Sequence, residues 1–209
     1  MFDIEYKGGN SITIATKKVR IVADPNRSVI GLKDVDVKDG VVLATEPRFL
    51  SGAGDARLTI EGPGEYEVGD FSIKGIPATR HIDTAPSGTT IYRITAGEIR
   101  LALLGNVAAN FDEDQLEAIG VIDIVIVPVG GGGYTLDAVS AASLVRQIEP
   151  KVVIPVHYAD SGLTYEVPQD PLKLFIDELG VSVEEVDKYK LKSAAALPPA
   201  MTVVEIKRS

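Results

Sequence analysis

The chain has 209 residues, of which 45% are hydrophobic and 24% charged, and its formal net charge is −9. This composition is that of a globular protein, and an acidic chain without a run of Lys or Arg disfavours binding to nucleic acid or to an anionic membrane. The sequence contains no cysteine, which excludes disulfides, thiolate nucleophiles and cysteine-ligated zinc.

The first half of the chain carries strand signals separated by short turns. Apolar and polar residues alternate in most of these segments, which is typical of strands with one buried face. We expect strands over residues 2–6, 11–16, 19–23, 41–44, 57–60, 65–68, 71–76, 89–95 and 98–104. Turns rich in Gly, Asn and Asp connect several of them, so this half is predicted to be a β-meander.

The second half alternates helices with apolar strands. Residues 121–129 and 151–156 are almost entirely apolar, which is typical of strands buried on both faces. Helices are predicted over residues 113–119, 135–148 and 170–179, and a last strand over residues 201–206. For the second helix, Thr135 is the expected N-cap and Asp137 lies in the first turn, where the helix dipole favours a carboxylate.

This order of elements predicts two sheets with flanking helices in one domain over residues 1–209. Residues 1–6 have neither the basic nor the apolar region of a signal peptide. No apolar run approaches the ~20 residues that span a membrane. We therefore expect a cytoplasmic protein without nucleic-acid or membrane partners, and the sequence leaves a homo-oligomer open.

Four segments match the order and spacing of a known family. They are residues 21–25, a strand that ends in Asp-Pro; 62–68, a Pro-Gly-Glu-Tyr hairpin; 127–137, a strand and glycine loop before a helix; and 148–158, a strand that ends in His-Tyr. Together they resemble the metallo-β-lactamase superfamily, in its compact branch of metal-dependent hydrolases. The resemblance implies an α+β fold of the αββα four-layer sandwich type, with two facing mixed β-sheets and helices on the outside. It also implies a dinuclear metal site where loops leave the strands.

Most metal-ligand positions of that family hold other residues in this chain. In the family, a His-x-His-x-Asp-His motif follows the strand that matches residues 41–45, and a histidine, a bridging aspartate and a last histidine come later. The corresponding residues here are Glu46, Arg48, Leu50, Ser51, His81, Asn106 and His157. A catalytic zinc needs about three protein ligands, and a guanidinium about 4 Å from a divalent ion would be repelled by roughly 8 kcal/mol at an effective dielectric of about 20. We therefore expect a degenerate site that holds no metal.

These replacements lead to three hypotheses for function. The first is a pseudoenzyme, a binding or scaffold protein that needs no metal and no other cofactor. The second is a hydrolase with an altered, mononuclear zinc or manganese site made from His81, His157 and Glu46 or an aspartate. The third is a structural subunit of an oligomer. No catalytic residue is assigned by the sequence, and His81 and His157 are the candidates.

Two local patterns each have two interpretations. Glycines 130–133 could hold a phosphate at the start of the next helix, but no lysine follows as in a P-loop, so a permissive turn is favoured. Ser51 and His157 could act as nucleophile and base, although the sequence does not fix their geometry.

The positions of the lost ligands predict a polar cleft. We expect Glu46, Arg48, His81, Asn106 and His157 to surround it, because the loops that form the family's site are still present. A buried guanidinium requires a partner, so Arg48 is expected to pair with Glu46 or another carboxylate. Such a cleft would bind a small polar or anionic ligand.

Overall fold

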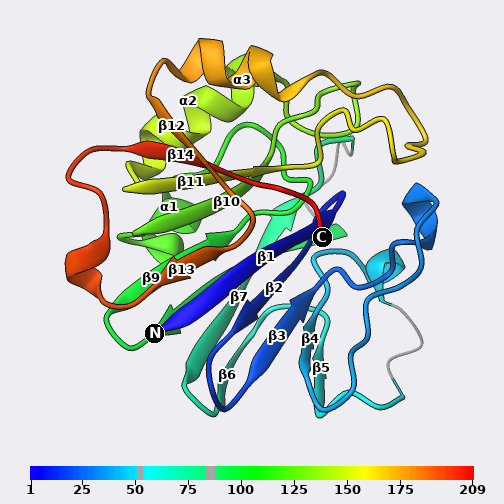
Figure 1. Ribbon diagram of the computed structural model, residues 1–209, viewed down its shortest axis with the longest axis vertical. Helices are drawn as coiled ribbons and strands as arrows, with labels where there is room; N and C mark the ends of the chain where they lie inside the picture. Colours follow the sequence, from blue (N-terminus) through cyan, green and yellow to red (C-terminus); the bar gives the residue numbers. More distant parts are fainter. Residues whose placement is uncertain (51–53, 83–87) are drawn as a thin grey trace.

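The computed structural model describes residues 1–50, 54–82 and 88–209, which form two β-sheets and three α-helices (Figure 1). The six-stranded sheet has the order β13-β1-β2-β3-β4-β5. Its strands are β1 (Phe2–Gly8), β2 (Ser11–Ala15), β3 (Arg20–Ala23), β4 (Val41–Leu43), β5 (Leu58–Ile60) and β13 (Tyr189–Leu191). Strands β1 to β3 pair antiparallel, whereas β3, β4 and β5 pair parallel.

The eight-stranded sheet has the order β12-β14-β11-β10-β9-β8-β7-β6. Its strands are β6 (Gly64–Val68), β7 (Phe71–Thr79), β8 (Gly88–Ala96), β9 (Ile99–Leu103), β10 (Ile124–Pro128), β11 (Val152–Val156), β12 (Ser182–Val186) and β14 (Thr202–Ile206). Strands β6, β7, β8 and β9 pair antiparallel with their neighbours in the sheet. The pairs β9–β10, β10–β11, β11–β14 and β14–β12 are parallel. Both sheets are therefore mixed, which confirms the predicted fold class.

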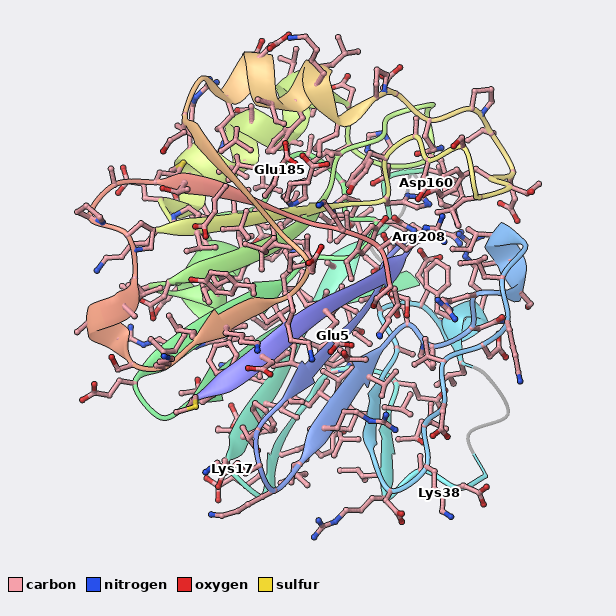
Figure 2. The ribbon with its side chains drawn as sticks, viewed as in Figure 1. Glu5, Lys17, Lys38, Asp160, Glu185 and Arg208 are labelled. Atoms are coloured by element: carbon pink, nitrogen blue, oxygen red, sulfur yellow. The ribbon has the colours of Figure 1, made fainter. Side chains whose placement is uncertain are left out.

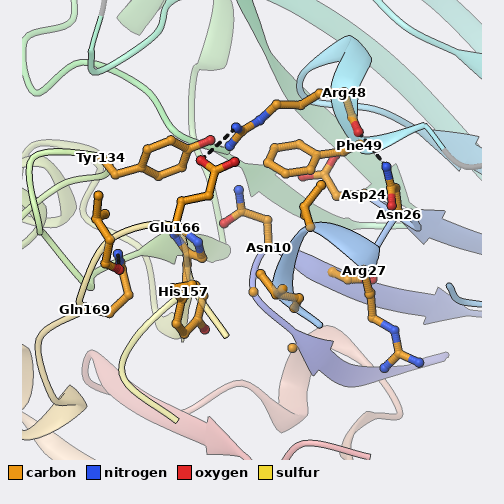
Figure 3. A pocket seen from close by; sticks show the side chains of 17 residues that line it. Asn10, Asp24, Asn26, Arg27, Arg48, Phe49, Tyr134, His157, Glu166 and Gln169 are labelled. Atoms are coloured by element: carbon orange, nitrogen blue, oxygen red, sulfur yellow. Dashed lines mark hydrogen bonds and ion pairs between the residues drawn. The ribbon is translucent and has the colours of Figure 1, made fainter. Parts of the chain in front are cut away.

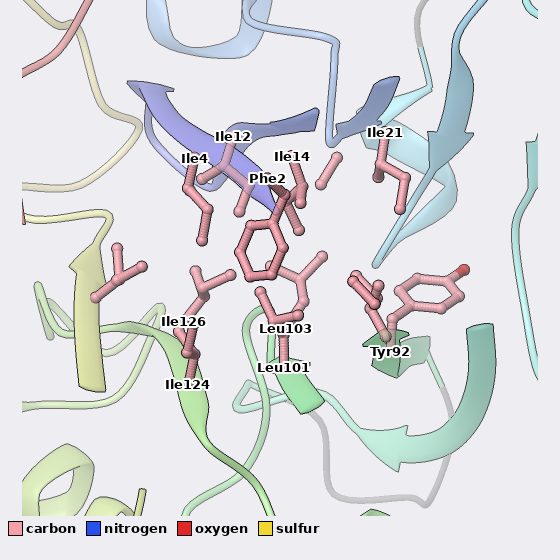
Figure 4. Close-up of a cluster of buried hydrophobic side chains, with 14 of the residues drawn as sticks. Phe2, Ile4, Ile12, Ile14, Ile21, Tyr92, Leu101, Leu103, Ile124 and Ile126 are labelled. Atoms are coloured by element: carbon pink, nitrogen blue, oxygen red, sulfur yellow. The ribbon is translucent and has the colours of Figure 1, made fainter. Parts of the chain in front are cut away.

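The main core lies between the two sheets (Figure 4). In β1 the burial alternates, so that Phe2, Ile4 and Tyr6 point inward and the intervening residues do not. They meet side chains from the other sheet, among them Leu101, Leu103, Ile124 and Ile126. The period-two pattern of the sequence thus predicted which face of β1 is buried.

The α-helices α1 (Glu113–Ile119), α2 (Ala138–Ile148) and α3 (Leu172–Leu179) pack on the outer face of the eight-stranded sheet. This is why all five residues of β10 and of β11 are buried. The outer face of the six-stranded sheet is covered instead by a small loop cluster around Val22, Val37 and Val42. Short 3-10 turns, η1 (Ser28–Ile30) and η2 (Pro47–Phe49), lie in the loops that follow β3 and β4, and η3 (Ala194–Ala196) precedes β14. In the described residues, no helix has the length and apolar character needed to cross a bilayer.

Three details differ from the sequence-based expectation. The first half is a meander only in part, because β3, β4 and β5 pair parallel and β5 and β6 lie in different sheets. Helix α2 begins at Ala138 with Asp137 as its N-cap, whose Oδ1 accepts a 2.7 Å bond from the backbone N–H of Ser140. Thr135, the expected cap, is fully buried two residues earlier. The strands β12 and β13 were not predicted, because β12 reads Ser-Val-Glu-Glu-Val and is mostly exposed at the edge of its sheet.

The C-terminal segment is fixed to the loop that follows β11. Arg208 donates from Nε to Asp160 Oδ2 at 2.6 Å and from Nη2 to Asp160 Oδ1 at 3.2 Å, a bidentate ion pair visible near the chain end in Figure 2. Bidentate geometry makes such a contact more specific than a single bond. It holds the chain end beside the segment that carries His157.

Candidate functional site

Glu46 is the buried acid of the candidate site, and only 2% of its surface is exposed. It is the residue before η2, in the loop directly after β4. Its Oε1 accepts a 2.7 Å bond from Asn106 Nδ2, and its Oε2 accepts a 3.2 Å bond from Arg80 Nη1 and lies 3.3 Å from Arg48 Nε. A carboxylate at this depth is stable only when such partners replace its water shell. The expected pairing of Arg48 with Glu46 is confirmed.

Arg48 holds a cation above two aromatic rings. Its guanidinium carbon lies 4.6 Å from the ring centroids of both Phe49 and Tyr134. Its Nη1 lies 3.5 Å from Glu166 Oε2 (Figure 3). Cation–π contacts and two carboxylates thus fix this side chain. Arg48 Nε lies 3.3 Å from Glu46 Oε2 but makes no hydrogen bond to it, because the N–H bond does not point at that oxygen.

His157 stands at the end of β11 and is 5% exposed. Its backbone has φ 53°, and its N–H donates to the carbonyl of Gly9 at 2.9 Å. The ring packs 4.9 Å from Tyr165 and 5.7 Å from Tyr134, between centroids, and Nδ1 has no hydrogen-bond partner in the described residues. Burial, and to a smaller extent the charge of Arg48, lowers the pKa of His157 to about 3. The imidazole is therefore uncharged at neutral pH.

Asp24 joins the end of β3 to the start of the Glu46 loop. Its Oδ1 accepts from the backbone N–H of Thr45 and its Oδ2 from Thr45 Oγ1, each at 2.7 Å. Burial outweighs these bonds and raises the pKa of Asp24 to about 7. The Asp-Pro pair at the end of an apolar strand was noticed in the sequence, but Asp24 was not predicted as a site residue.

A cavity of about 30 Å³ lies between these groups (Figure 3). Asn10, Asp24, Arg48, Tyr134 and His157 contribute to its wall. Each buried water needs roughly 10–15 Å³ by this measure, so the cavity holds two or three water-sized groups. Asn10, Tyr134 and Asp24 are site residues that sequence reasoning missed. A polar Asn directly after the Gly8–Gly9 turn was the available signal for Asn10.

A wider cavity of about 800 Å³ lies elsewhere, between β7, β8 and α1. None of the described side chains that line it has a buried polar atom without a partner. Such atoms are concentrated instead at the smaller cavity, in Asn10, Arg48, Tyr134, His157 and Gln169. Unpaired buried groups are unfavourable unless something fills the space beside them, so the smaller cavity is the better candidate.

The predicted site residues are only partly brought together. Glu46, Arg48 and Asn106 are in direct contact, and Arg48 and His157 line one cavity. His81 is half-buried and does not line this cavity; its backbone N–H donates to the carbonyl of Asn106 at 2.8 Å. Leu50 packs on the loop cluster over the six-stranded sheet. Ser51 lies outside the described residues, and with it the expected Ser51–His157 pairing.

The glycine run packs tightly and carries no phosphate-binding geometry. A Cβ on Gly130 would lie 2.2 Å from the carbonyl oxygen of His157 and 2.4 Å from Gln169 Oε1. Residues 131–133 all have positive φ. The N-terminus of α2 is already capped by the carboxylate of Asp137. The contacts support the interpretation as a close-packed turn.

The side chains present do not fit a catalytic metal. Among residues 1–50, 54–82 and 88–209, no group of three or more His, Asp or Glu side chains could hold one ion. Both oxygens of Glu46 are engaged by Asn106 and arginines. The guanidinium of Arg48 adds a positive charge beside the remaining donor, His157. A divalent cation would meet repulsion here rather than a set of free ligands.

The comparison with known families decides the identity of the fold. A family model described as the beta-lactamase superfamily domain matches residues 3–157. The chain belongs to the beta-lactamase superfamily. A UPF0173 metal-dependent hydrolase of Carboxydothermus hydrogenoformans is 30% identical over 102 residues, which are 46% of this chain and 44% of that relative. Another of the same name, from Methanopyrus kandleri, is 27% identical over 132 residues, 59% of this chain and 56% of the relative.

The matched part of this superfamily member thus spans about half the length of these curated relatives. Among solved structures, a proposed Zn-dependent hydrolase of the metallo-beta-lactamase superfamily from Thermotoga maritima superposes with a TM-score of 0.78. It is 24% identical, and the match covers 99% of this chain and 100% of that one. This likeness shows that the two share a fold.

Proposed function

We propose that this superfamily member is a metal-free binding protein, a pseudoenzyme that keeps the pocket of its fold without the metal. The observation that carries the proposal is the buried Glu46 carboxylate, which is held by Asn106, Arg80 and Arg48. Glu46, Arg48 and Asn106 stand where the family resemblance places metal ligands. The contacts compensate the buried Glu46 carboxylate without an ion.

The ligand that we propose is small and polar or anionic. It would bind in the cavity beside Arg48 and His157, where several buried polar atoms have no partner. The neutral imidazole and the guanidinium supply donors and acceptors for it. No covalent step is part of this proposal.

The names of the relatives favour a second hypothesis, a metal-dependent hydrolase. His157 Nδ1 is an imidazole nitrogen, a common zinc ligand, and it has no hydrogen-bond partner among the described residues. For zinc to bind, Glu46 would have to release Asn106 and both arginines. That rearrangement would break the buried contacts of Glu46 with Asn106 and the arginines, which is destabilising.

Metal analysis separates the two hypotheses. The protein is purified without added metal, dialysed against a chelator, and its zinc and manganese are counted by inductively coupled plasma mass spectrometry. We expect far less than one ion per chain, and no competition with a chromophoric chelator during zinc titration. The double variant Arg48→His/Asn106→Asp restores ligand types and is the positive control, with more zinc retained than in the wild type. One tightly held ion per wild-type chain would overturn the proposal and favour the hydrolase.

A further inference from the structure

Two deeply buried polar side chains at the small cavity each have one atom without a hydrogen-bond partner. Asn10 and His157 are each 5% exposed, both line the cavity, and Asn10 Oδ1 and His157 Nδ1 make no hydrogen bond in the described residues. Leaving a buried acceptor unsatisfied is unfavourable by about 1–3 kcal/mol per group. The cavity is therefore built to receive a group that hydrogen-bonds to them.

A relay of amides fixes which atom Asn10 presents. Glu46 can only accept, so Asn106 must direct Nδ2 to Glu46 Oε1, at 2.7 Å. This leaves Asn106 Oδ1 to accept from Asn10 Nδ2, at 3.0 Å. Asn10 Oδ1 is then the atom without a partner. The buried charge of Glu46 thus determines, through two amides, that the cavity offers an acceptor at Asn10.

The charged side chains at the cavity are of both signs. Arg27 and Arg48 line it, and so do Asp24 and Glu166. Arg48 is already shared between Glu46 and Glu166, so an anion would compete with two carboxylates for this guanidinium. A cation would meet the guanidinium of Arg48 directly. Since an uncompensated charge in a partly buried site is unfavourable, an uncharged ligand is preferred over either ion.

Two residues that line the same cavity also carry unpaired hydrogen-bond donors. Arg48 Nε and Tyr134 Oη are buried without a hydrogen bond, and both can donate. An uncharged ligand that complements this wall must carry N–H groups for Asn10 Oδ1 and an acceptor oxygen for Arg48 or Tyr134. A primary amide or a urea unit has both, on a planar group of a few atoms that matches a cavity of about 30 Å³.

We propose that this cavity binds the uncharged carboxamide or urea group of a small molecule, with the ligand N–H donating to Asn10 Oδ1. The inference rests on the metal-free function proposed above and names its ligand class. It narrows the choice between polar and anionic ligands to an uncharged polar one.

Three probes of the same shape test this choice of charge. Acetamide is neutral, acetate is its anionic isostere and acetamidinium its cationic isostere. Each is titrated into the ¹⁵N-labelled wild-type protein, and the backbone amide signals of Gly9, Asn10 and His157 are followed by NMR. A ligand of four heavy atoms binds at best with a Kd of about 0.1 mM, so we expect a millimolar Kd for acetamide and values at least tenfold higher for both ions.

A pair of matched variants tests the contact. Asn10→Ala removes the acceptor, and we expect it to raise the Kd of acetamide about tenfold. Asn110→Ala is the control, since Asn110 is exposed and lines the other cavity. The Kd of acetamide for this variant should stay within twofold of that for the wild type. If Asn10→Ala does not fold, the ranking of the three probes on the wild type decides alone.

Two outcomes overturn the inference. In one, none of the probes shifts the three signals, which would mean that the cavity holds water only. In the other, acetate or acetamidinium binds as well as acetamide. Either result leaves the metal-free function standing if the protein also retains no metal, whereas bound zinc would refute that function independently of the probes.

Discussion

Asn106 Nδ2 donates a 2.7 Å hydrogen bond to Glu46 Oε1, although the two residues lie 60 positions apart in the chain. Both side chains are almost fully buried. In the family resemblance, each stands at a position that would bind metal. Here a neutral amide and a carboxylate satisfy each other, and the arginines compensate the remaining charge. The two residues therefore form a hydrogen-bonded pair in the interior of the fold.

Glu46→Gln should destabilise the protein without changing its shape. Glutamine has nearly the same volume but no charge, so the buried ion pairs of residue 46 with Arg80 and Arg48 are lost. Breaking a buried pair is destabilising by about 3–5 kcal/mol; since both arginines keep contact with solvent, we expect about 2 kcal/mol, measured by urea denaturation. Glu67→Gln, at an exposed position of β6, should change the free energy of unfolding by less than about 0.5 kcal/mol. Equal effects in both variants would contradict the proposed role of Glu46.

Asp24→Asn should change how stability depends on pH. Burial raises the pKa of Asp24 in the folded state to about 7, above its ordinary value of 3.8. Between these pH values the folded protein binds more protons than the unfolded chain, so the contribution of Asp24 to stability falls as the pH rises through that window. Relative to the wild type, the asparagine variant should therefore gain stability between pH 4 and pH 7, by a few kcal/mol, in denaturation series at fixed ionic strength. Asparagine tolerates the positive φ at this position. A constant difference across the window would show that Asp24 keeps an ordinary pKa.

His157 should make the opposite contribution. Its pKa is lowered from 6.5 to about 3 in the folded state. As the pH falls below about 6.5, His157 becomes protonated in the unfolded chain but not in the folded protein, so its contribution to stability is lost. The ring ¹⁵N shifts of the folded protein should stay those of a neutral imidazole at pH 5. In a His157→Asn variant, the stability difference from the wild type should shrink as the pH falls from 6.5 towards 3. An imidazolium signal from folded protein at pH 5 would refute the proposed burial of this ring.

Gly130→Ala should be strongly destabilising for a steric reason. The added Cβ would lie 2.2 Å from the backbone carbonyl oxygen of His157, which cannot move away cheaply, and 2.4 Å from Gln169 Oε1. We expect a loss of about 3 kcal/mol, with a disturbed His157 environment visible in NMR spectra. Gly54→Ala meets no atom within 4 Å, and its effect should be below about 0.5 kcal/mol. A neutral Gly130→Ala would mean that the turn can open.

The sequence alone determined most of the sheet architecture and the residue types at the positions where the family resemblance places metal ligands. Alternating residues such as Phe2, Ile4 and Tyr6 fix the buried face of a strand, because a shift by one residue would turn every side chain to the wrong side. In the family resemblance Arg48 stands at a histidine position and Asn106 at the bridging aspartate position, and both differences are visible in single positions. A guanidinium has no acceptor atom for a metal, and a neutral amide lacks the charge of a carboxylate.

Only the tertiary structure decided which side chains contact Glu46 and which residues share the cavity. Asn10, Glu46 and Asn106 come from three separate loops, and their relay depends on how two sheets bring these loops together. The same closure places Tyr134 over Arg48 and leaves the His81 side chain outside the cavity. Hydrogen bonds between side chains that are distant in the chain depend on sheet register and loop closure. The residues next to each position in the sequence therefore carry no information on such contacts.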